Sequence, residues 1–376
     1  MQSCDVLIVG AGIAGASAAY EIAQSAEVIL LERESQPGYH TTGRSAAVYA
    51  PGYGNRVIRI LTAASSPFYH DRAGGLAEHP VLTPRGALFV ARQDQLATLD
   101  ALFTEIRAQV PALERLDASK VLARVPVLRA DYVAGGLYDP TSMDMDVAAI
   151  HQGYLKGFRA RGGTLITDAE VTAIAADGAS WRVETRAGSF AAKVLVDAAG
   201  AWADELATMA GVAPVGLTPK RRTAILFEAS VQPDPAWPIV LDADEEFYFK
   251  PESGLLLGSP ADETPVPPSD VQPEELDVAI AIDRIERAAD FQVRLVRRKW
   301  AGLRTFASDR TPVVGMDETR PGFFWLAGQG GYGIQMAPAL ARAAARLLLE
   351  GTLPDDLSDQ GLRAEDLMPA RLRHAS

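Results

Sequence analysis

A glycine-rich hexapeptide near the amino terminus constrains the fold of this chain more than any other feature. The segment GAGIAG supplies Gly10, Gly12 and Gly15 in the GxGxxG spacing. The segment DVLIVG that leads into it is continuously apolar, as a buried strand is, and the Ala-rich residues 13–25 have the length of a helix. Because a second buried strand is predicted at 27–32, these elements form a βαβ unit with a parallel sheet and a right-handed crossover.

This unit also predicts a dinucleotide site. Glycine permits the tight turn and lets the backbone approach a pyrophosphate, whose charge the N-terminal end of the helix dipole favours. Glu32 lies 20 residues past Gly12, at the end of the second strand, where a carboxylate accepts hydrogen bonds from ribose hydroxyls. A glycine-rich turn in another α/β fold is the alternative, and the motif does not distinguish NAD from FAD.

Two distant segments favour FAD. VLVDAAGAW, which contains Gly200, and FFWLAGQGGYGIQ at 323–335 each lead from a buried strand into a turn of small residues. The second turn enters a helix near Gln335, whose N-terminus would stabilise negative charge on a reduced isoalloxazine ring. Taken alone, each segment is typical of ordinary strand-to-helix packing, so only their combination with the first motif indicates an extended cofactor.

Composition excludes several classes of function. The net charge of -12 argues against nucleic-acid binding, which needs Lys and Arg at the phosphates. Cys4 is the only cysteine, so the chain has neither a disulfide framework nor a CxxC site, and we expect no metal. No Lys or Arg precedes the apolar stretch at 6–15, and no run reaches about 18 apolar residues. We therefore predict a cytoplasmic protein without a transmembrane segment, with a peripheral place at the inner face of the membrane left open.

The 376 residues suit two domains, or one domain with an insertion. Strands around the turn Asp177-Gly178 and the alternating stretch 219–260 predict antiparallel pairing. A helical run is predicted at 274–293, and a long helix ends at Gly351. The fold class predicted is α/β, with an antiparallel β-sheet (α+β) substrate domain beside the nucleotide-binding domain.

Seven segments along nearly the whole chain match one family: 31–47, 138–146, 151–157, 219–222, 247–261, 300–304 and 328–335. The chain resembles the D-amino-acid oxidase and dehydrogenase superfamily, and most of all its bacterial D-arginine dehydrogenase type. The resemblance implies a discontinuous Rossmann-type FAD-binding domain at 1–82, 146–218 and 306–376, and a substrate domain at 83–145 and 219–305.

The resemblance also implies which residues contact a non-covalent FAD. Cys4 lies before the first strand, so a cysteinyl link is not expected, whereas histidyl attachment stays open. Val171 would contribute its backbone, and Gly331 would also lie near the substrate. The implied cofactor residues, including the glycines of the first motif, are Gly10, Gly12, Ala14, Gly15, Glu32, Arg33, Thr41, Thr42, Gly43, Arg44, Ser45, Ala46, Ala47, Val171, Gly200, Gly331, Tyr332, Gly333, Ile334 and Gln335.

For the substrate, the resemblance implies Arg222 and Arg304 as partners of an amino-acid carboxylate, with Tyr248 assisting and Tyr53 closing over the site. Arginine suits this role because its planar fork binds both carboxylate oxygens. From the residues alone, each of these side chains has an ordinary structural alternative. Strand alternation puts Arg221 on the opposite face from Arg222, where we expect a solvated surface group.

The sequence departs from the D-arginine type at two positions. The glutamate that receives a cationic side chain is replaced by Ala87, and the histidine after GRSAA by Val48. Without that acid a buried guanidinium has no charge partner, so we predict neutral, apolar D-amino acids as substrates. A nearby acidic cluster could supply a substitute charge, although we expect it to be an exposed loop: Asp242, Asp244, Glu245 and Glu246.

The predicted reaction is oxidative deamination of a D-amino acid by hydride transfer from Cα to flavin N5, with a quinone or another electron acceptor. No catalytic base stands out, and the five histidines are expected to be structural or exposed. An oxidase that passes electrons to O₂ and acts on glycine or sarcosine is the alternative. A flavin-binding regulator or subunit without turnover, and an NAD-dependent dehydrogenase, are further ones.

Overall fold

The computed structural model describes residues 1–373. Within them the chain forms three β-sheets, which contain eight, ten and three strands. In the eight-stranded sheet, the first strand pairs in parallel with the second and with β12, and α1 (Ile13–Ile22) connects the first two. This confirms the predicted βαβ unit. The strands of this sheet are β1 (Gln2–Val9), β2 (Val28–Leu31), β9 (Thr164–Ile166), β10 (Val171–Asp177), β11 (Ser180–Thr185), β12 (Gly188–Asp197), β19 (Val313–Met316) and β20 (Phe323–Ala327).

The predicted hairpin at Asp177-Gly178 is present, with Gly178 at φ 62°. Strand β12 pairs antiparallel with β11 but parallel with β1 and β20, so the sheet is mixed rather than antiparallel in this part. Side chains of β1 alternate between two cores. Val6 and Ile8 pack with helices on one face, while Leu7 and Val9 pack on the other. Both faces of this sheet are therefore covered.

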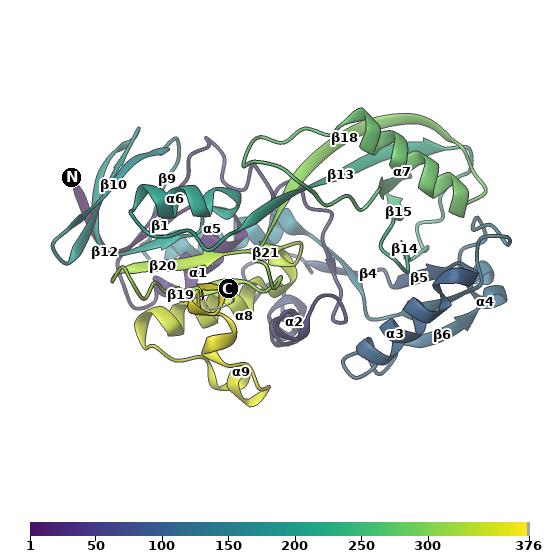
Figure 1. Cartoon of the computed structure of the whole chain (residues 1–376), viewed down its shortest axis with the longest axis horizontal. Helices are drawn as coiled ribbons and strands as arrows, with labels where there is room; N and C mark the ends of the chain where they lie inside the picture. Colours follow the sequence, from purple (N-terminus) through teal and green to yellow (C-terminus); the bar gives the residue numbers. More distant parts are fainter. Residues whose placement is uncertain (374–376) are drawn as a thin grey trace.

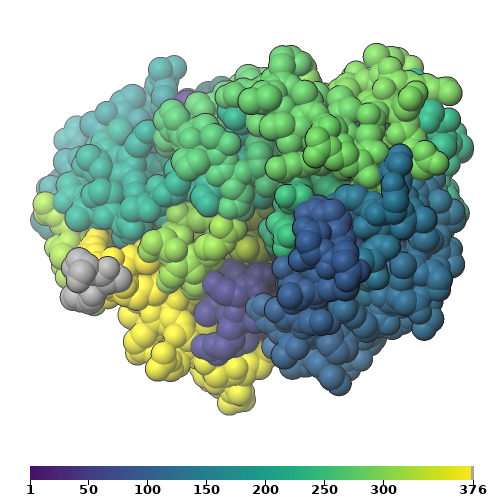
Figure 2. Space-filling view, turned by 45° about the vertical axis from the view of Figure 1, so that its right-hand side comes forward, coloured from purple at the N-terminus to yellow at the C-terminus, as the bar shows by residue number. Residues whose placement is uncertain are grey.

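The helices on the first of these faces bury their apolar sides against each other and the sheet (Figure 1). They come from distant parts of the chain, and α1 packs against both α5 and α8. In the space-filling view the purple part of the chain, which includes α2, lies between the yellow carboxy-terminal residues and the blue residues that follow α2 in the sequence (Figure 2). These helices are α2 (Arg56–His70), α5 (Val147–Ala160) and α8 (Gly333–Leu349).

The ten-stranded sheet contains two long paired strands, β13 and β18, and α7 (Glu275–Ala288) packs against both of them (Figure 1). The predicted helix at 274–293 is thus shorter, and β18 begins at Val293. The strands are β5 (Ala87–Ala91), β6 (Glu114–Asp117), β7 (Gly135–Asp139), β13 (Thr218–Ala229), β14 (Ile239–Asp242), β15 (Tyr248–Glu252), β16 (Leu255–Ser259), β17 (Thr264–Pro265), β18 (Val293–Phe306) and β21 (Gln329–Gly330).

One face of this second sheet is sealed by α7 and by α4 (Ala118–Arg124), against residues such as Ile225, Phe227 and Phe249. Its other face includes Ala87 and Arg222, which line a cavity. Three further strands form a separate small sheet: β3 (Val48–Tyr49), β4 (Leu82–Pro84) and β8 (Met143–Met145). The two large sheets draw on the two sets of segments predicted as domains, except that β21 joins the second sheet; the division itself stays a prediction. Within the described residues, no helix combines the length and apolar character needed to cross a bilayer.

Candidate active site

One cavity extends from the glycine turn after β1 to the free face of the ten-stranded sheet. It is lined by all five residues predicted for the substrate and by Val48 and Ala87. The predicted cofactor residues also line it, with the exceptions of Gly15, Gly43 and Tyr332. Residues more than 300 positions apart in the sequence therefore meet around one space.

The glycines of the first motif have different tasks. Gly10 has φ 102°, and a Cβ there would lie 2.4 Å from the carbonyl oxygen of Ala198. A Cβ on Gly15 would lie 1.9 Å from the carbonyl oxygen of Gly10, so Gly15 permits close packing behind the turn and lines no part of the cavity. Gly43 similarly packs against the carbonyl of Gly38. These two glycines shape the site from outside it.

Glu32 is buried at the carboxyl end of β2, as the motif predicts. Its carboxylate accepts backbone hydrogen bonds from Ala11 at 3.0 Å and from Glu34 at 3.1 Å. Burial is the main cause that raises the pKa of Glu32, and these two bonds oppose it. Each oxygen keeps a lone pair for another donor, so the carboxylate fits the ribose hydroxyls of a nucleotide.

Two helix N-termini open into the cavity. Helix α1 begins after Gly12 and α8 after Tyr332, and neither has an acidic residue in its first turn or a cap from the side chain of its N-cap residue. The Thr42 hydroxyl accepts a hydrogen bond from the Ile13 amide at 3.0 Å, which leaves later amides of α1 free. Free amides and the helix dipole favour negative charge. The two ends fit the diphosphate and the flavin of an FAD lying along the cavity.

The loop 38–47 closes one side of the cavity, and two of its polar side chains, Thr41 and Arg44, bind to β18 of the second sheet. Thr41 donates to the carbonyl of Leu303 at 2.8 Å. The Arg44 guanidinium donates to the carbonyls of Val271 and Ala301, at 3.0 and 3.2 Å, and pairs with Asp270. The predicted cofactor role of Arg44 is therefore not that of a free cation, because the protein itself satisfies its guanidinium.

At the far end, four polar side chains from four elements converge. Arg222 comes from β13, Tyr248 from β15, Arg304 from β18 and Tyr53 from the loop before α2. A Cβ on Gly331 would lie 2.8 Å from the Cζ of Arg304, so only glycine lets the guanidinium occupy this place. No carboxylate within residues 1–373 lies within ion-pair distance of Arg304. Its charge therefore lacks a fixed partner.

Arg221 and Arg222 lie on opposite faces of β13, as strand alternation predicts, but Arg221 is not a solvated surface group. It is buried beneath α7, where it pairs with Glu274 and, at 2.8 Å, with Asp277. The prediction was wrong because α7, whose position depends on the tertiary structure, brings two acids over that face. Arg222 is buried on the cavity face.

Tyr53 packs edge-on against Tyr332, with ring centroids 4.9 Å apart. Burial is the main cause that raises the pKa of Tyr53 to about 12, so the phenol stays protonated and is a hydrogen-bond donor rather than a base. The next turn is anchored by Asn55, which caps α2 by accepting from the Ile58 amide at 3.1 Å.

Among the histidines, His151 is buried and bonded to the carbonyl of Ala11 at 2.8 Å, and burial lowers its pKa. His40 does line the cavity, bonded to Glu34 at 2.9 Å, although no motif placed it there. His70 bonds to Ser66 within α2 and His79 is exposed. His374 lies outside the described residues. None of the described histidines lies beside Arg222 and Arg304 in this arrangement.

The wall beside Val48 and Ala87 is mainly apolar. Among the described residues its one acid is Asp139, the cross-strand partner of Ala87 on β7, whose carboxylate accepts hydrogen bonds from Thr141 and Ser142. Phe89 follows Ala87 by two positions on β5, and Ile239 and Leu241 alternate in the same way on the neighbouring strand β14. Sequence reasoning missed these three residues, although the alternation of GALFV and of the strand containing them carries the signal. Other residues missed at the cavity include Ile106, Trp202, Glu205, Met209 and Ala224.

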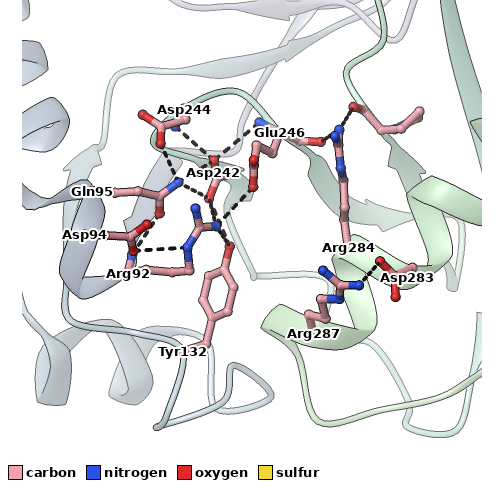
Figure 3. Close-up of polar contacts among 11 residues, drawn as sticks. Arg92, Asp94, Gln95, Tyr132, Asp242, Asp244, Glu246, Asp283, Arg284 and Arg287 are labelled. Atoms are coloured by element: carbon pink, nitrogen blue, oxygen red, sulfur yellow. Dashed lines mark hydrogen bonds and ion pairs between the residues drawn. The ribbon is translucent and has the colours of Figure 1, made fainter.

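The acidic cluster between β14 and β15 is only partly the exposed loop that we expected. Asp242 is fully buried, and its carboxylate accepts hydrogen bonds from Gln95 and Tyr132 (Figure 3). It also accepts hydrogen bonds from the backbone amides of Asp244 and Glu246 in the turn. Arg92 bridges Asp242 and Glu246, at 3.6 and 3.0 Å. This network fixes the turn that carries Glu245, the one acid of the four that lines the cavity.

Comparisons with known proteins agree with this geometry. A family model described as FAD dependent oxidoreductase (DAO) matches residues 5–347. The chain is 25% identical to glycine oxidase of Geobacillus kaustophilus (strain HTA426), with 98% of this chain and 97% of that protein covered. The crystal structure of L-proline dehydrogenase from P.horikoshii matches with a TM-score of 0.85 at 21% identity, covering 100% of this chain and 99% of that one. L-amino acid deaminase from Proteus vulgaris gives a TM-score of 0.81 at 14% identity, covering 99% and 97%. The structural matches confirm the predicted fold class.

Proposed function

Because this chain belongs to the DAO family of FAD-dependent oxidoreductases, we propose that it oxidises the Cα–N bond of D-amino acids with neutral, apolar side chains. Its cofactor is FAD, as the sequence predicted. The product is an imino acid, which hydrolyses to a 2-oxo acid and ammonia. The proposal of the D configuration rests on the segments that resemble the D-arginine dehydrogenase type, such as 31–47 and 328–335.

The observation that carries this proposal is the unpaired guanidinium of Arg304 in the cavity. A half-buried charge without an anionic partner loses part of its hydration without compensation, so such a group is expected where a ligand supplies the opposite charge. Arg304 lies against Gly331, at the start of the turn that leads into α8. An amino acid whose carboxylate binds there would have its Cα beside the turn that is predicted to hold the flavin ring.

The residues at this end of the cavity have complementary roles. Arg304 and Arg222 bind the substrate carboxylate, Tyr248 donates a hydrogen bond to it, and Tyr53 covers the bound substrate and excludes water. When bound, FAD supplies the two-electron acceptor for the hydride from Cα. Tyr53 stays a neutral phenol and does not act as a base. The substrate amine therefore gives its proton to solvent water before Tyr53 closes over the site.

The apolar wall of Ala87, Phe89, Ile239 and Leu241 supports an uncharged substrate side chain. These side chains offer no hydrogen bond, so a guanidinium or ammonium held against them would lose hydration without compensation. Of the four acids at 242–246, only Glu245 lines the cavity, and it is exposed, so solvent screens its charge. The Asp139 carboxylate, opposite Ala87, is already bonded to Thr141 and Ser142. We expect D-leucine and D-phenylalanine to have higher kcat/KM values than D-arginine or D-lysine.

Anaerobic bleaching of the flavin absorbance tests cofactor, stereochemistry and turnover together. Rapid bleaching by D-leucine but not by L-leucine is expected, and Arg304→Met should lower kcat/KM by about a hundredfold or more while FAD stays bound. Bleaching by no amino acid of either configuration would reject the proposal. We propose a quinone or another organic acceptor; peroxide released in air at the rate of turnover would instead identify an oxidase, like the relative named glycine oxidase.

A further inference from the structure

Three cations converge on one carboxylate beside the proposed substrate carboxylate site. Glu263, which precedes β17, binds Lys220 at 2.9 Å, Arg222 at 3.3 Å, and Arg310 through two bonds at 2.9 and 3.0 Å. Lys220 and Arg222 project from the same face of β13, and Arg310 lies in the turn after β18. Glu263 therefore joins three separate segments at the edge of the cavity.

The contacts of Arg222 leave only one edge of its guanidinium free. Its Nε donates to the carbonyl of Asp262 at 2.8 Å and its Nη2 to Glu263 at 3.3 Å. These two nitrogens form the side-on fork of the guanidinium. The end-on fork, made by Nη1 and the second hydrogen of Nη2, remains for a ligand carboxylate. The segment 262–263 thus sets the direction from which Arg222 can bind.

That segment is itself fixed. The Asp262 carboxylate accepts the Thr223 amide at 2.6 Å and lies 3.1 Å from the Thr223 hydroxyl. Ala261 and Arg310 both have left-handed backbones, with φ of 52° and 58°, which non-glycine residues adopt only when their surroundings impose it. The bidentate ion pair between Glu263 and Arg310 links the turn that contains Ala261 to the turn that contains Arg310.

A chain of contacts connects Arg310 to Tyr53, the residue proposed to cover the bound substrate. Arg310 stacks over the Phe306 ring at 4.1 Å, and Phe306 packs on Tyr332, whose ring contacts Tyr53. The hydrogen bonds from Arg310 are the main cause that lowers the pKa of Glu263 to about 2, so this carboxylate is ionised at any pH at which the enzyme would act. Three cations against one acid leave a net positive charge for an anionic ligand.

We propose that Glu263 is a positioning residue, which holds Arg222 with its end-on edge toward the substrate carboxylate and ties the Arg310 turn behind Tyr332 and Tyr53. This inference rests on the proposed function. A surface ion pair without such a role is the alternative. The two alternatives predict opposite changes in affinity when the charge of Glu263 is removed. Loss of a negative charge beside Arg222 by itself strengthens the binding of an anion, whereas loss of positioning weakens it.

The test uses the FAD-loaded variants Glu263→Gln and Glu263→Asp, with Glu228→Gln as a matched control. Glu228 is also on β13 and also pairs with an arginine, Arg297, but lies outside the cavity. Each protein is titrated with 4-methylpentanoate, a carboxylate without an amine, and the change in the flavin absorbance gives Kd. We expect Kd to rise about tenfold or more in Glu263→Gln, less in Glu263→Asp, and not at all in the control.

Anaerobic reduction by D-leucine provides the second measurement. The apparent Kd for D-leucine should rise in Glu263→Gln, while the limiting rate of flavin reduction stays within about twofold, because only binding of the carboxylate is disturbed. An unchanged or tighter Kd in Glu263→Gln, with D-leucine still oxidised, overturns this inference alone. If Glu263→Gln does not retain FAD, Glu263→Asp decides, and a Kd equal to that of the unmodified protein overturns it. Failure of the unmodified protein to bind the carboxylate and to be reduced by any amino acid rejects the proposed function as well.

Discussion

At the scale of single residues, the site depends on a few groups whose surroundings are unusual. Arg304 is a cation without a fixed anion, and Asp197, at the end of β12, is a fully buried acid with one oxygen unbonded. The proposed substrate carboxylate would be the partner of the first. The second has no partner in the described residues other than the Ala199 amide, which binds the other oxygen at 3.1 Å.

We expect Asp197→Asn to stabilise the protein at pH 7. Burial is the main cause that raises the pKa of Asp197 well above its ordinary value. A raised pKa means that the stabilising contribution of this acid is complete below the pKa of the unfolded chain and is lost as the pH rises toward the folded pKa. Asparagine does not titrate, so the gain, on the order of 1–3 kcal/mol, should shrink as the pH approaches 4.

Thermal unfolding of the holoenzyme between pH 4 and pH 8 measures this difference. The matched substitution Asp317→Asn should have the opposite effect, because Asp317 is paired with Arg373 and bonded to Trp325 at 3.0 Å. Equal destabilisation by both substitutions would show that Asp197 is ionised in the folded protein.

A second prediction concerns Gly331→Ala. The added Cβ would lie 2.8 Å from the Arg304 guanidinium, which must move. Because the carboxylate would then bind out of line with the flavin, kcat/KM for D-leucine should fall about ten- to a hundredfold with FAD still bound. Gly135→Ala, where the nearest atom is 3.4 Å away, is the control and should leave the kinetics unchanged. Full activity of Gly331→Ala would contradict the placement of the carboxylate at Arg304.

At the scale of elements, the turn between β14 and β15 combines a fixed backbone with an acid at the cavity. Glu245 has φ 57°, and the bonds around Asp242 hold the turn in this conformation (Figure 3). The carboxylate is exposed, so it acts on the substrate as a screened charge rather than as a direct partner. It should disfavour substrates with acidic side chains.

Glu245→Gln is therefore expected to raise kcat/KM for D-glutamate relative to D-leucine by about two- to fivefold at low ionic strength, and by less in high salt. Asp244→Asn changes an exposed acid of the same turn that does not line the cavity, and should alter this ratio little. The ratio of kcat/KM values at two salt concentrations is the measurement. If Glu245→Gln lowers kcat/KM for D-lysine by a larger factor than it raises kcat/KM for D-glutamate, Glu245 is instead a binding partner for cationic substrates.

At the scale of the whole molecule, two carboxylates, Glu263 and Asp317, link distant parts of the chain. Both have lowered pKa values and become protonated in the same pH range. Hydrogen bonds from Arg310 lower the pKa of Glu263 to about 2. Burial would raise the pKa of Asp317, but bonds from Arg373 and Trp325 outweigh it and lower the pKa to about 2. Lowered pKa values give stability that is present above the unfolded pKa and is lost as the pH falls toward the folded value.

The holoenzyme should accordingly lose thermal stability between about pH 4.5 and pH 2. The double variant Glu263→Gln with Asp317→Asn should have a lower Tm at pH 6 but a shallower decline below pH 4.5. Differential scanning calorimetry at a series of pH values measures both slopes, and parallel curves would contradict the roles given to these two carboxylates.

The sequence by itself determined the local units of this protein. The glycine spacing with its two flanking strands specified the βαβ unit and predicts where the cofactor binds, because a tight turn against a pyrophosphate depends on residues within one short segment. The period-two pattern of β13 likewise specified that Arg221 and Arg222 face opposite ways, and family resemblance placed Val48, Ala87 and Gly331 at positions that line the cavity.

Only the tertiary structure decided what each face meets. Arg221 became buried because α7 lies over it, and Phe89 joined Leu241 because β5 pairs with β14. Asp242 is bonded to Gln95, from the turn after β5, and to Tyr132, from the loop before β7. The convergence of Lys220, Arg222 and Arg310 on Glu263 is of the same kind. Burial and charge pairing depend on contacts between segments far apart in the chain, and a local pattern carries no information about which distant segment completes them.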